Sequence, residues 1–265
     1  MEFIELIGFS AITASIVMVI AFFISIIKRD AGVVDVAWGI GFVMVSAVAM
    51  FLNVSFVERS WIVMGLVFFW GGRLAIHILS RNRGKKEDWR YAQWRNEWGS
   101  SFIRRSFFHI FLIQAVLIVI VSVPIVFIHY LPEHGLGIGD SIGIALWCIG
   151  FVFEVVGDHQ LRQFTSQPQN KGKVMTEGLW RYTRHPNYFG EVTMWWGIFI
   201  IALSLPNGIF TVVGPVTITY LILFVSGIPL LEKKYASNKA FQQYRQVTSI
   251  FFPWFPKKTM QDKVI

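Results

Sequence analysis

The sequence has little charge and almost no cysteine, and each shortage excludes a class of protein. Charged residues make up 15% of the 265-residue chain, well below the roughly 25% that is typical of soluble domains. In such an apolar chain the net charge of +8 is not a signal for nucleic acid, and we predict no nucleic-acid partner. The single cysteine, Cys148, lies in an apolar run, so we predict no intrachain disulfide and no metal site.

Two common sequence motifs are also missing. No Gly-x-Gly-x-x-Gly run follows a predicted strand, and no βαβ unit is present, which excludes a Rossmann nucleotide site. The first apolar run follows Glu2 and Glu5 rather than a basic segment, and no small-residue cleavage site ends it. We therefore expect this run to be a retained helix instead of a signal peptide.

The chain does contain a series of long apolar runs, and about 20 predominantly apolar residues are enough to cross a bilayer. This pattern predicts an all-α integral membrane protein in which residues 1–265 form one membrane domain. We expect seven transmembrane helices, of which the fifth and sixth are completed by neighbouring polar segments. They lie near residues 6–27, 33–54, 61–80, 107–128, 141–157, 188–205 and 209–231.

The basic residues give these helices an orientation. Of the 24 lysines and arginines, 22 fall on segments that seven alternating spans place on one side of the membrane. Arg59 alone lies on the opposite side, and Arg73 lies within a span. Because basic loops remain in the cytoplasm, the N-terminus is predicted to lie outside and the C-terminus inside.

One short stretch, Gly178–Glu191, concentrates polar groups at the mouth of a predicted helix. It reads GLWRYTRHPNYFGE, and Pro186 suits the first turn of the helix that follows. Asn187 and Glu191 are four residues apart and share one face of that helix. The candidate cofactor-binding residues in this stretch are Arg181, Tyr182, Arg184, His185, Asn187, Tyr188 and Glu191.

The stretch Gly178–Glu191 resembles, almost without a gap, the C-terminal signature of the steroid 5-alpha-reductase-like family of integral membrane reductases. The resemblance implies an NADPH-dependent enzyme that lies in the inner membrane of a bacterium. The isoprenylcysteine carboxyl methyltransferases share only the shorter core of Arg184, His185, Pro186 and Tyr188.

Asp35 is the first candidate catalytic residue, because a carboxylate within a membrane helix normally faces the bundle interior or a wet cavity. In 5-alpha-reductases, a carboxylate early in the second span helps to hold the substrate ketone, although their usual Gln-Glu pair is absent here. Trp38 lies three residues further on and is a candidate for lining the substrate cavity. The alternative is that Asp35 pairs with Lys28 or Arg29 near the headgroups.

The loop 81–105 contains the run Glu-Asp-Trp-Arg-Tyr, and the bacterial proteins that this chain resembles have a similar run there. Its tryptophans and tyrosine suit the membrane interface. Tyr91 is the second candidate catalytic residue, as an alternative to a protonated Asp35 for donating a hydrogen bond to the substrate ketone. For most of the loop, an interfacial segment held by salt bridges is an equally good interpretation.

Arg73 and His77 lie on one face of the third span, which leads toward the basic loop. Arginine can fork onto phosphate oxygens, so this face predicts a phosphate-bearing ligand. The alternative is that Arg73 extends to the membrane interface.

On the fifth span, three charged residues recur every four positions. An internal salt-bridge ladder is one account of them, whereas the resemblance implies that the second and third contact the dinucleotide. The first stands where relatives often have Asn and is a candidate for lining the substrate cavity. The three residues are Glu154, Asp158 and Arg162.

Two polar segments supply the remaining candidates. The segment after the fifth span contains glycine, and its backbone can approach a ligand closely; its candidates are Asn170, Lys171 and Lys173. The tail resembles the family's closing segment, with a simple amphipathic anchor as the alternative; its candidates are Glu232, Lys233 and Tyr244. We expect cytoplasmic loops 81–105 and 158–187 and the tail 232–265 to cover the cofactor.

Together these residues predict the NADPH-dependent reduction of the C=C bond of a lipophilic enone, such as a 3-oxo-Δ4 steroid. Hydride goes to the β-carbon while a polar group polarises the ketone oxygen. The predicted partners are the lipophilic substrate and membrane lipids. One alternative is an S-adenosylmethionine-dependent methyltransferase acting on an isoprenoid or a phospholipid, although this cofactor needs no cluster of cations. Another is a lipid carrier without enzymatic activity.

Overall fold

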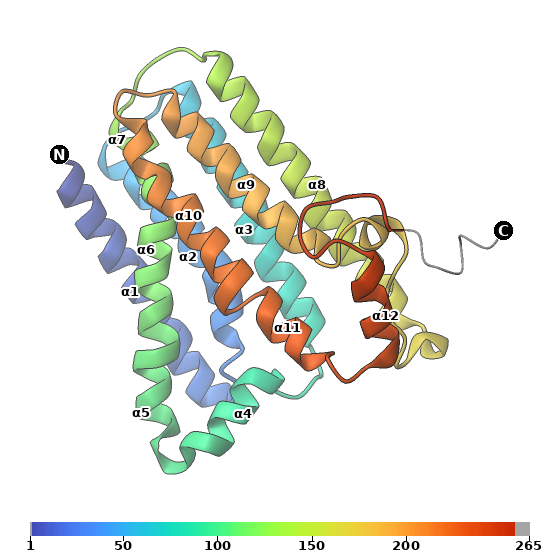
Figure 1. Cartoon of the computed structure of the whole chain (residues 1–265). Coiled ribbons are helices and arrows are strands. Elements are labelled where there is room, and N and C mark those ends of the chain that lie inside the picture. The colour runs from blue at the N-terminus through green and yellow to red at the C-terminus, as the bar shows by residue number, and fades with distance from the viewer. Residues whose placement is uncertain (1, 258–265) are drawn as a thin grey trace. The chain divides into compact units, whose positions relative to one another are not determined.

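The computed structural model describes residues 2–257, and these residues form helices and loops without any strand (Figure 1). The all-helical prediction is therefore confirmed for this part of the chain. The end of the predicted tail, residues 258–265, lies outside the described residues.

Six helical stretches of the described chain are long and apolar enough to cross a membrane, which supports an integral membrane protein. Helix α9 (Pro186–Leu203), the predicted sixth span, is not among them, because the polar residues in its first turns lower its mean hydropathy. The predicted count of seven is thus not confirmed. The six stretches are α1 (Phe3–Lys28), α2 (Val33–Leu52), α3 (Glu58–Asn82), Trp89–Val121, Ile138–Ser166 and Gly208–Lys234.

The chain divides into two compact units. Unit 1 consists of the residues up to Asp140 together with Ile201–Gly214. Unit 2 consists of Ser141–Ile200 and the residues from Pro215 onward. The prediction of one membrane domain stays a prediction.

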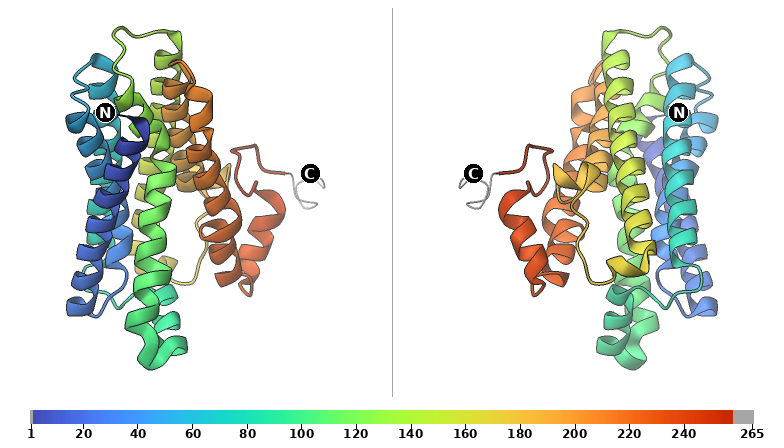
Figure 2. Two further views of the ribbon diagram at one scale, coloured as in Figure 1. Left: turned by 90° about the vertical axis from the view of Figure 1, so that its left-hand side faces the viewer. Right: turned by 90° about the vertical axis from the view of Figure 1, so that its right-hand side faces the viewer.

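Unit 1 is built on α1, α2 and α3, with α2 packed against both of the others and α1 also against α6 (Ile113–Val121), as Figures 1 and 2 show. Helices α2 and α3 approach each other most closely at Gly39 and Gly71. A Cβ atom added to either glycine lies 2.5 Å from the carbonyl oxygen of the other. This approach, which requires glycine on both helices, holds the first turns of α2 and their Asp35 next to α3.

The segment predicted as loop 81–105 contains a helix, α4 (Trp89–Trp98). It begins there because the Asp88 side chain accepts a hydrogen bond from the Arg90 N–H over 3.0 Å and so caps the helix. It ends at Gly99, which has a φ of 49°. The chain then continues through η1 (Gly99–Ser101), α5 (Phe102–Ser106), η2 (Phe107–Leu112), α6 and α7 (Val123–Tyr130).

Unit 2 contains an antiparallel pair of helices, α8 (Ile138–Ser166) and α9, which again meet at glycines. A Cβ atom on Gly190 lies 2.4 Å from the carbonyl oxygen of Gly150, and one on Gly197 lies 2.6 Å from that of Gly143. Helix α8 continues past its predicted end at residue 157, because no proline interrupts it before Pro168. The start of the predicted loop 158–187 is therefore helical.

The remaining helices are short. The predicted helix 209–231 is divided into α10, a π-helical turn and α11, which has Pro229 in its first turn. In the tail, the Asn238 side chain caps α12 by accepting the N–H groups of Ala240 and Phe241. These elements are η3 (Pro168–Asn170), η4 (Gly178–Arg181), η5 (Gly208–Val212), α10 (Val213–Tyr220), η6 (Leu221–Val225), α11 (Ile228–Lys234) and α12 (Lys239–Val247).

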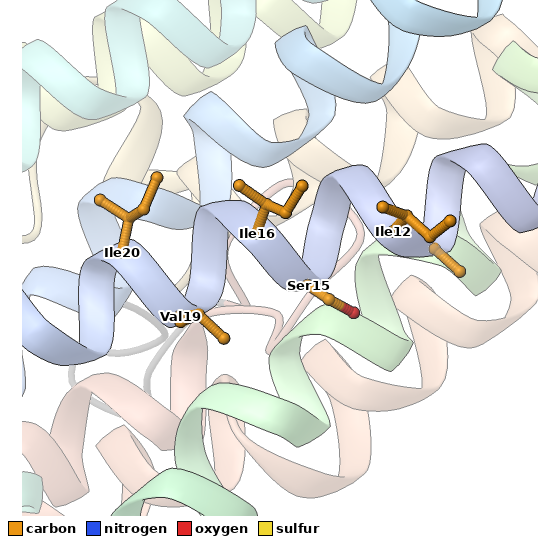
Figure 3. A pocket seen from close by; sticks show the side chains of 6 residues that line it. Ile12, Ser15, Ile16, Val19 and Ile20 are labelled. Atoms are coloured by element: carbon orange, nitrogen blue, oxygen red, sulfur yellow. The ribbon is translucent and has the colours of Figure 1, made fainter.

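A shallow groove of about 420 Å³ lies on α1 (Figure 3). Ser15 is the one polar residue among those that line it, and three isoleucines follow one another at successive turns of the helix. The groove contains none of the predicted site residues, and its apolar lining suits contact with lipid chains. The lining residues are Ala11, Ile12, Ser15, Ile16, Val19 and Ile20.

Candidate functional site

The structure brings Asp35 and Tyr91 into direct contact within unit 1. The Tyr91 hydroxyl donates to Asp35 Oδ1 over 2.6 Å, and the Arg90 guanidinium donates to Asp35 Oδ2 over 2.7 Å. Tyr91 is buried, with 3% of its surface exposed. In the described part of the chain, the ion-pair partner of Asp35 is thus Arg90 rather than Lys28 or Arg29.

The cap at the start of α4 explains how Arg90 reaches Asp35. Asp88, which caps the helix, also accepts from Arg90 Nε over 2.9 Å. This bond holds one edge of the guanidinium and leaves Nη2 directed at Asp35. The guanidinium carbon also lies 5.1 Å from the centre of the Tyr91 ring. Two adjacent residues in the first turn of α4 therefore hold both oxygens of one carboxylate on α2.

Glu87 fastens the same segment to the start of α2. Its carboxylate accepts the backbone N–H of Ala31 over 2.8 Å and two hydrogen bonds from Arg95, each of 2.8 Å. Burial favours the neutral form of Glu87, but the hydrogen bonds from Arg95 and Ala31 outweigh it and lower its pKa. For Asp88, burial is likewise outweighed by Arg90, and the pKa is lowered.

The other candidates of unit 1 lie on α2 and α3. Trp38 is half-buried, and its ring meets Phe42 edge-on, with 5.0 Å between the ring centres. Arg73 and His77 are half-buried and one turn apart on α3, the helix that Gly71 packs against α2. Their roles stay predictions.

In unit 2, the Glu232 carboxylate binds three basic side chains. Arg184 Nε donates to Oε1 over 2.9 Å, and the His185 Nε2 atom lies 3.2 Å from the same oxygen. Arg245 Nε lies 3.0 Å from Oε2. The Arg184 and Glu232 side chains are 7% and 11% exposed, so this is a largely buried ionic cluster.

The predicted binding stretch is also tied to the tail through its backbone. The Arg184 N–H donates to the Ser249 carbonyl over 2.9 Å, and its Nη1 donates to the Thr248 carbonyl over 2.7 Å. The Trp254 N–H donates to the Tyr182 carbonyl over 2.9 Å. The tail therefore holds this stretch in place.

Tyr244 adds a further contact between the tail and this stretch. Its hydroxyl donates to the carbonyl oxygen of Trp180, whose indole N–H donates to the Gly157 carbonyl on α8 over 3.0 Å. Burial raises the pKa of Tyr244, so the hydroxyl keeps its proton and remains a donor. Tyr244 thus links the tail to α8 by way of Trp180.

One nitrogen of His185 has no hydrogen-bond partner among the described residues. Burial lowers the pKa of His185, and the hydrogen bond with Glu232 opposes this effect without cancelling it, so the ring is neutral at pH 7. Because the Glu232 carboxylate is an acceptor, Nε2 carries the hydrogen. The buried Nδ1 atom is then an acceptor without a donor.

Helices α8 and α9 bring together several of the other candidates. Asn187 Nδ2 donates to Asp158 Oδ1 over 3.2 Å, which joins the two helices near the start of α9. Tyr188 stacks on His185, with 5.7 Å between the ring centres and 22° between the planes. Glu154 is 3% exposed, and Glu191 is half-buried.

The remaining candidates of unit 2 lie at the surface. Five cations are exposed, and they are available to a ligand from solution. Tyr182 is half-buried, and the Asn170 side chain donates to the Phe164 carbonyl over 3.0 Å, which stabilises the turn after α8. The exposed cations are Arg162, Lys171, Lys173, Arg181 and Lys233.

Two residues of these clusters did not stand out in the sequence. Arg90 contacts Asp35, which precedes it by 55 positions, and no local spacing connects the two. Arg245 contacts Glu232 from α12, where it occupies an ordinary exposed position of an amphipathic helix. The signal for Arg90 was its place in the Glu-Asp-Trp-Arg-Tyr run, whereas for Arg245 it was only an arginine in a predicted cytoplasmic segment.

A family model described as "Protein of unknown function (DUF1295)" matches residues 21–248. The chain belongs to this family, which is steroid 5-alpha-reductase-like, and the predicted resemblance is confirmed.

Individual relatives match shorter parts of the chain. A 3-oxo-5-alpha-steroid 4-dehydrogenase 1 of Bos taurus is 30% identical over 112 residues, which are 42% of this chain and 40% of the relative. The protein of the same name from Mus musculus is 35% identical over 68 residues, which are 26% and 27% of the two chains. A very-long-chain enoyl-CoA reductase of Dictyostelium discoideum is 32% identical over 73 residues, or 28% and 24%.

The chain thus spans less than half the length of these relatives, all of which carry the names of oxidoreductases. No solved structure matches the chain.

Proposed function

We propose that the protein is an NADPH-dependent oxidoreductase that reduces the C=C bond of a lipophilic enone, such as a 3-oxo-Δ4 steroid. Membership of the family supports an oxidoreductase of this class. The observation that carries the proposal is the 2.6 Å hydrogen bond from Tyr91 to Asp35, because it holds a proton-bearing hydroxyl against a carboxylate beside an apolar bundle.

Unit 2 fits a dinucleotide. The buried Nδ1 acceptor of His185 suits an amide or hydroxyl donor, such as the carboxamide or a ribose hydroxyl, and the exposed cations suit phosphates. NADPH supplies a hydride from its nicotinamide ring. The residues of unit 2 proposed to hold it are Asp158, Arg162, Asn170, Lys171, Lys173, Arg181, Tyr182, Arg184, His185, Asn187, Tyr188, Glu191, Glu232, Lys233 and Tyr244.

The residues of unit 1 would stabilise the charge that develops on the substrate. When hydride reaches the β-carbon, the electrons of the C=C bond move toward the ketone oxygen, and a proton later adds at the α-carbon. The Tyr91 hydroxyl donates a hydrogen bond to that oxygen. Asp35 orients the hydroxyl, while Trp38 lines the substrate cavity.

We also propose that α9 is a seventh span. It lies antiparallel to α8, with Gly197 opposite Gly143 at one end and Pro186 opposite Gly157 at the other. Helix α9 therefore accompanies α8, which is itself long and apolar enough to cross a membrane, over most of its length. An odd number of spans places the N-terminus outside and the C-terminus in the cytoplasm, on the side of the basic loops. We further propose that the membrane is the inner membrane of a bacterium, as the resemblance implies.

The first experiment compares ligands by thermal shift. The purified protein in detergent is titrated with NADPH, with NADH and with S-adenosylmethionine, because a ligand that binds the native state raises the melting temperature. We expect NADPH to raise it at micromolar concentration and S-adenosylmethionine to leave it unchanged. Stabilisation by S-adenosylmethionine alone would replace this proposal with the methyltransferase.

A further inference from the structure

Helix α12 of the tail is amphipathic, and its apolar face is turned inward. Phe241 and Tyr244 are buried, and the centre of the Phe241 ring lies 5.6 Å from that of the Tyr235 ring. The exposed positions of the helix carry glutamine, lysine, arginine and one alanine. A helix that anchors a protein to a membrane turns its apolar face outward instead. The structure therefore argues against α12 itself as the membrane anchor of the tail.

The segment that follows α12 exposes large aromatic side chains. We call residues 248–256 the aromatic strap, and it is the red loop between α12 and the C-terminus in Figure 1. Its Phe252, Trp254 and Phe255 are 70%, 73% and 76% exposed. Large apolar side chains that gather at a surface indicate a contact with a partner or a membrane.

Hydrogen bonds fix the backbone of the aromatic strap. The Lys257 N–H donates to the Val247 carbonyl over 2.9 Å and closes the strap at its base. The Thr183 hydroxyl donates to the Phe251 carbonyl over 2.8 Å, and a further bond joins the strap to the carbonyl of Tyr182. The exposed rings are thus carried by a backbone whose position is set by unit 2.

The tail around the aromatic strap carries charge of one sign. From Lys233 to Lys257 the sequence contains five basic residues and no acidic one. All five are exposed, among them Lys239 at the start of α12 and Lys257 next to the strap. Aromatic rings settle at the headgroup level of a bilayer, and lysines are attracted to anionic headgroups. A second copy of this tail is a poorer partner, because it would bring like charges together.

We infer that the aromatic strap is a membrane-interface anchor that contacts anionic phospholipid. Phe252, Trp254 and Phe255 enter the headgroup region of the bilayer. Lys239 and Lys257 meet the anionic headgroups beside them. This inference goes beyond the proposed function, because it assigns the tail a lipid surface whatever reaction the protein performs.

The anchor also has a consequence for the predicted binding stretch. The strap binds that stretch through Tyr182 and Thr183, and the Ser249 carbonyl accepts the Arg184 N–H over 2.9 Å. Lipid contact on one side of the strap therefore steadies Gly178–Glu191 on the other.

Spin labelling of the full-length protein in nanodiscs tests the anchor. The single cysteine is removed by Cys148→Ser, and a nitroxide is attached through Trp254→Cys. Its accessibility is measured to oxygen, which concentrates in the bilayer, and to a water-soluble nickel chelate. Gln243→Cys on the exposed face of α12 is the aqueous control, and Ile16→Cys in the groove on α1 is the lipid control.

In nanodiscs of equal parts phosphatidylcholine and phosphatidylglycerol, the oxygen-to-nickel ratio at position 254 should exceed that at 243 severalfold and approach that at 16. A ratio equal to that at 243 overturns the inference. Low accessibility to both reagents also overturns it, because a second copy or another protein then covers the strap. Phe252→Cys provides the same test if Trp254→Cys does not fold.

The charge of the lipid tests the second part of the inference. In nanodiscs of phosphatidylcholine alone the ratio at position 254 should fall, because the lysines then lack anionic headgroups. Adding Lys239→Gln and Lys257→Gln should make the ratio the same in both bilayers. A ratio at 254 that does not depend on phosphatidylglycerol in the chain with both lysines contradicts the assignment of an anionic surface.

Discussion

The two units each build a cluster around one carboxylate, but the clusters differ in what they leave available. In unit 1, Asp35 is held by two adjacent residues of α4, and one of them, Tyr91, presents a hydroxyl proton. In unit 2, Glu232 is held by three basic side chains that come from two distant segments. The first cluster is suited to chemistry and the second to holding chain segments together.

This difference changes how the predicted cofactor residues are interpreted. Arg184, Glu232 and Tyr244 use most of their polar atoms on one another or on backbone carbonyls. Their loss should act on stability first and on the cofactor only as a consequence. The exposed lysines and the Nδ1 atom of His185 remain available to a ligand.

The largest expected effect is on the Glu232 cluster. Glu232→Gln removes the charge that balances Arg184, and breaking a buried ion pair costs about 3–5 kcal/mol. The melting temperature should fall sharply even without NADPH, whereas Arg162→Gln, at an exposed cation, should leave it unchanged. Equal melting of Glu232→Gln and wild type would show that this cluster does not hold the fold.

The hydroxyl of Tyr91 should matter to turnover and hardly at all to binding. Tyr91→Phe is expected to lower the reduction rate by about a hundredfold, because a positioned proton donor typically contributes that much. The thermal shift with NADPH should match that of wild type. If Tyr91→Phe reduces the substrate at the wild-type rate, the Asp35 cluster of unit 1 has no chemical role that distinguishes it from the Glu232 cluster of unit 2.

The next largest effect is expected from a substitution at the glycine contacts of unit 2. Gly190→Ala places a methyl group 2.4 Å from the Gly150 carbonyl oxygen, and overpacking of this kind costs about 1–3 kcal/mol. Gly8→Ala is the control, since a Cβ atom there meets nothing within 4 Å. A lower melting temperature for Gly190→Ala alone is the expected result, and equal melting of both variants would argue against the close helix pair.

His185 predicts a dependence of stability on pH. Because burial lowers its pKa in the folded protein, the unfolded chain binds more protons below the ordinary pKa, near 6.5. The contribution of neutral His185 to the stability of the fold is complete above this ordinary pKa and is lost as the pH falls below it. Melting measured from pH 8 to pH 5 should therefore decline less steeply in His185→Gln than in wild type, and identical slopes would exclude this contribution.

The smallest expected effects concern single exposed lysines. Lys171→Gln and Lys173→Gln should each weaken NADPH binding by about twofold to fivefold, the range of exposed ion pairs. NADH binding should change less if either lysine meets the 2′-phosphate, and added salt should reduce the difference. An equal loss for both dinucleotides would place these lysines away from that phosphate.

Some of this architecture follows from local patterns in the sequence. The apolar runs predicted α1, α2 and α3 with ends close to those of the structure, because a bilayer-length run has few alternatives. The polar composition of α4 and of the end of α8 predicts loops there, because it conceals the Asp88 cap and the absence of proline before Pro168.

The contacts within the candidate site were harder to predict. Residue type and position point to Asp35 and to Tyr91 separately, and the sequence does not predict the hydrogen bond between them. Arg90 is next to Tyr91 in the chain, but its ion pair with Asp35 arises only when the fold brings the first turn of α4 within side-chain reach of the start of α2. The family signature singled out Arg184 and His185 without indicating that Glu232 binds both.

The central claim is tested most directly by following the hydride. The purified protein is incubated with progesterone and NADPH in which both hydrogens at C4 of the nicotinamide are replaced by deuterium, and the steroid is analysed by mass spectrometry and NMR. We predict one deuterium at the β-carbon of the reduced enone and a much slower transfer in Tyr91→Phe. A reduced product without deuterium, or equal transfer by wild type and Tyr91→Phe, would contradict the account.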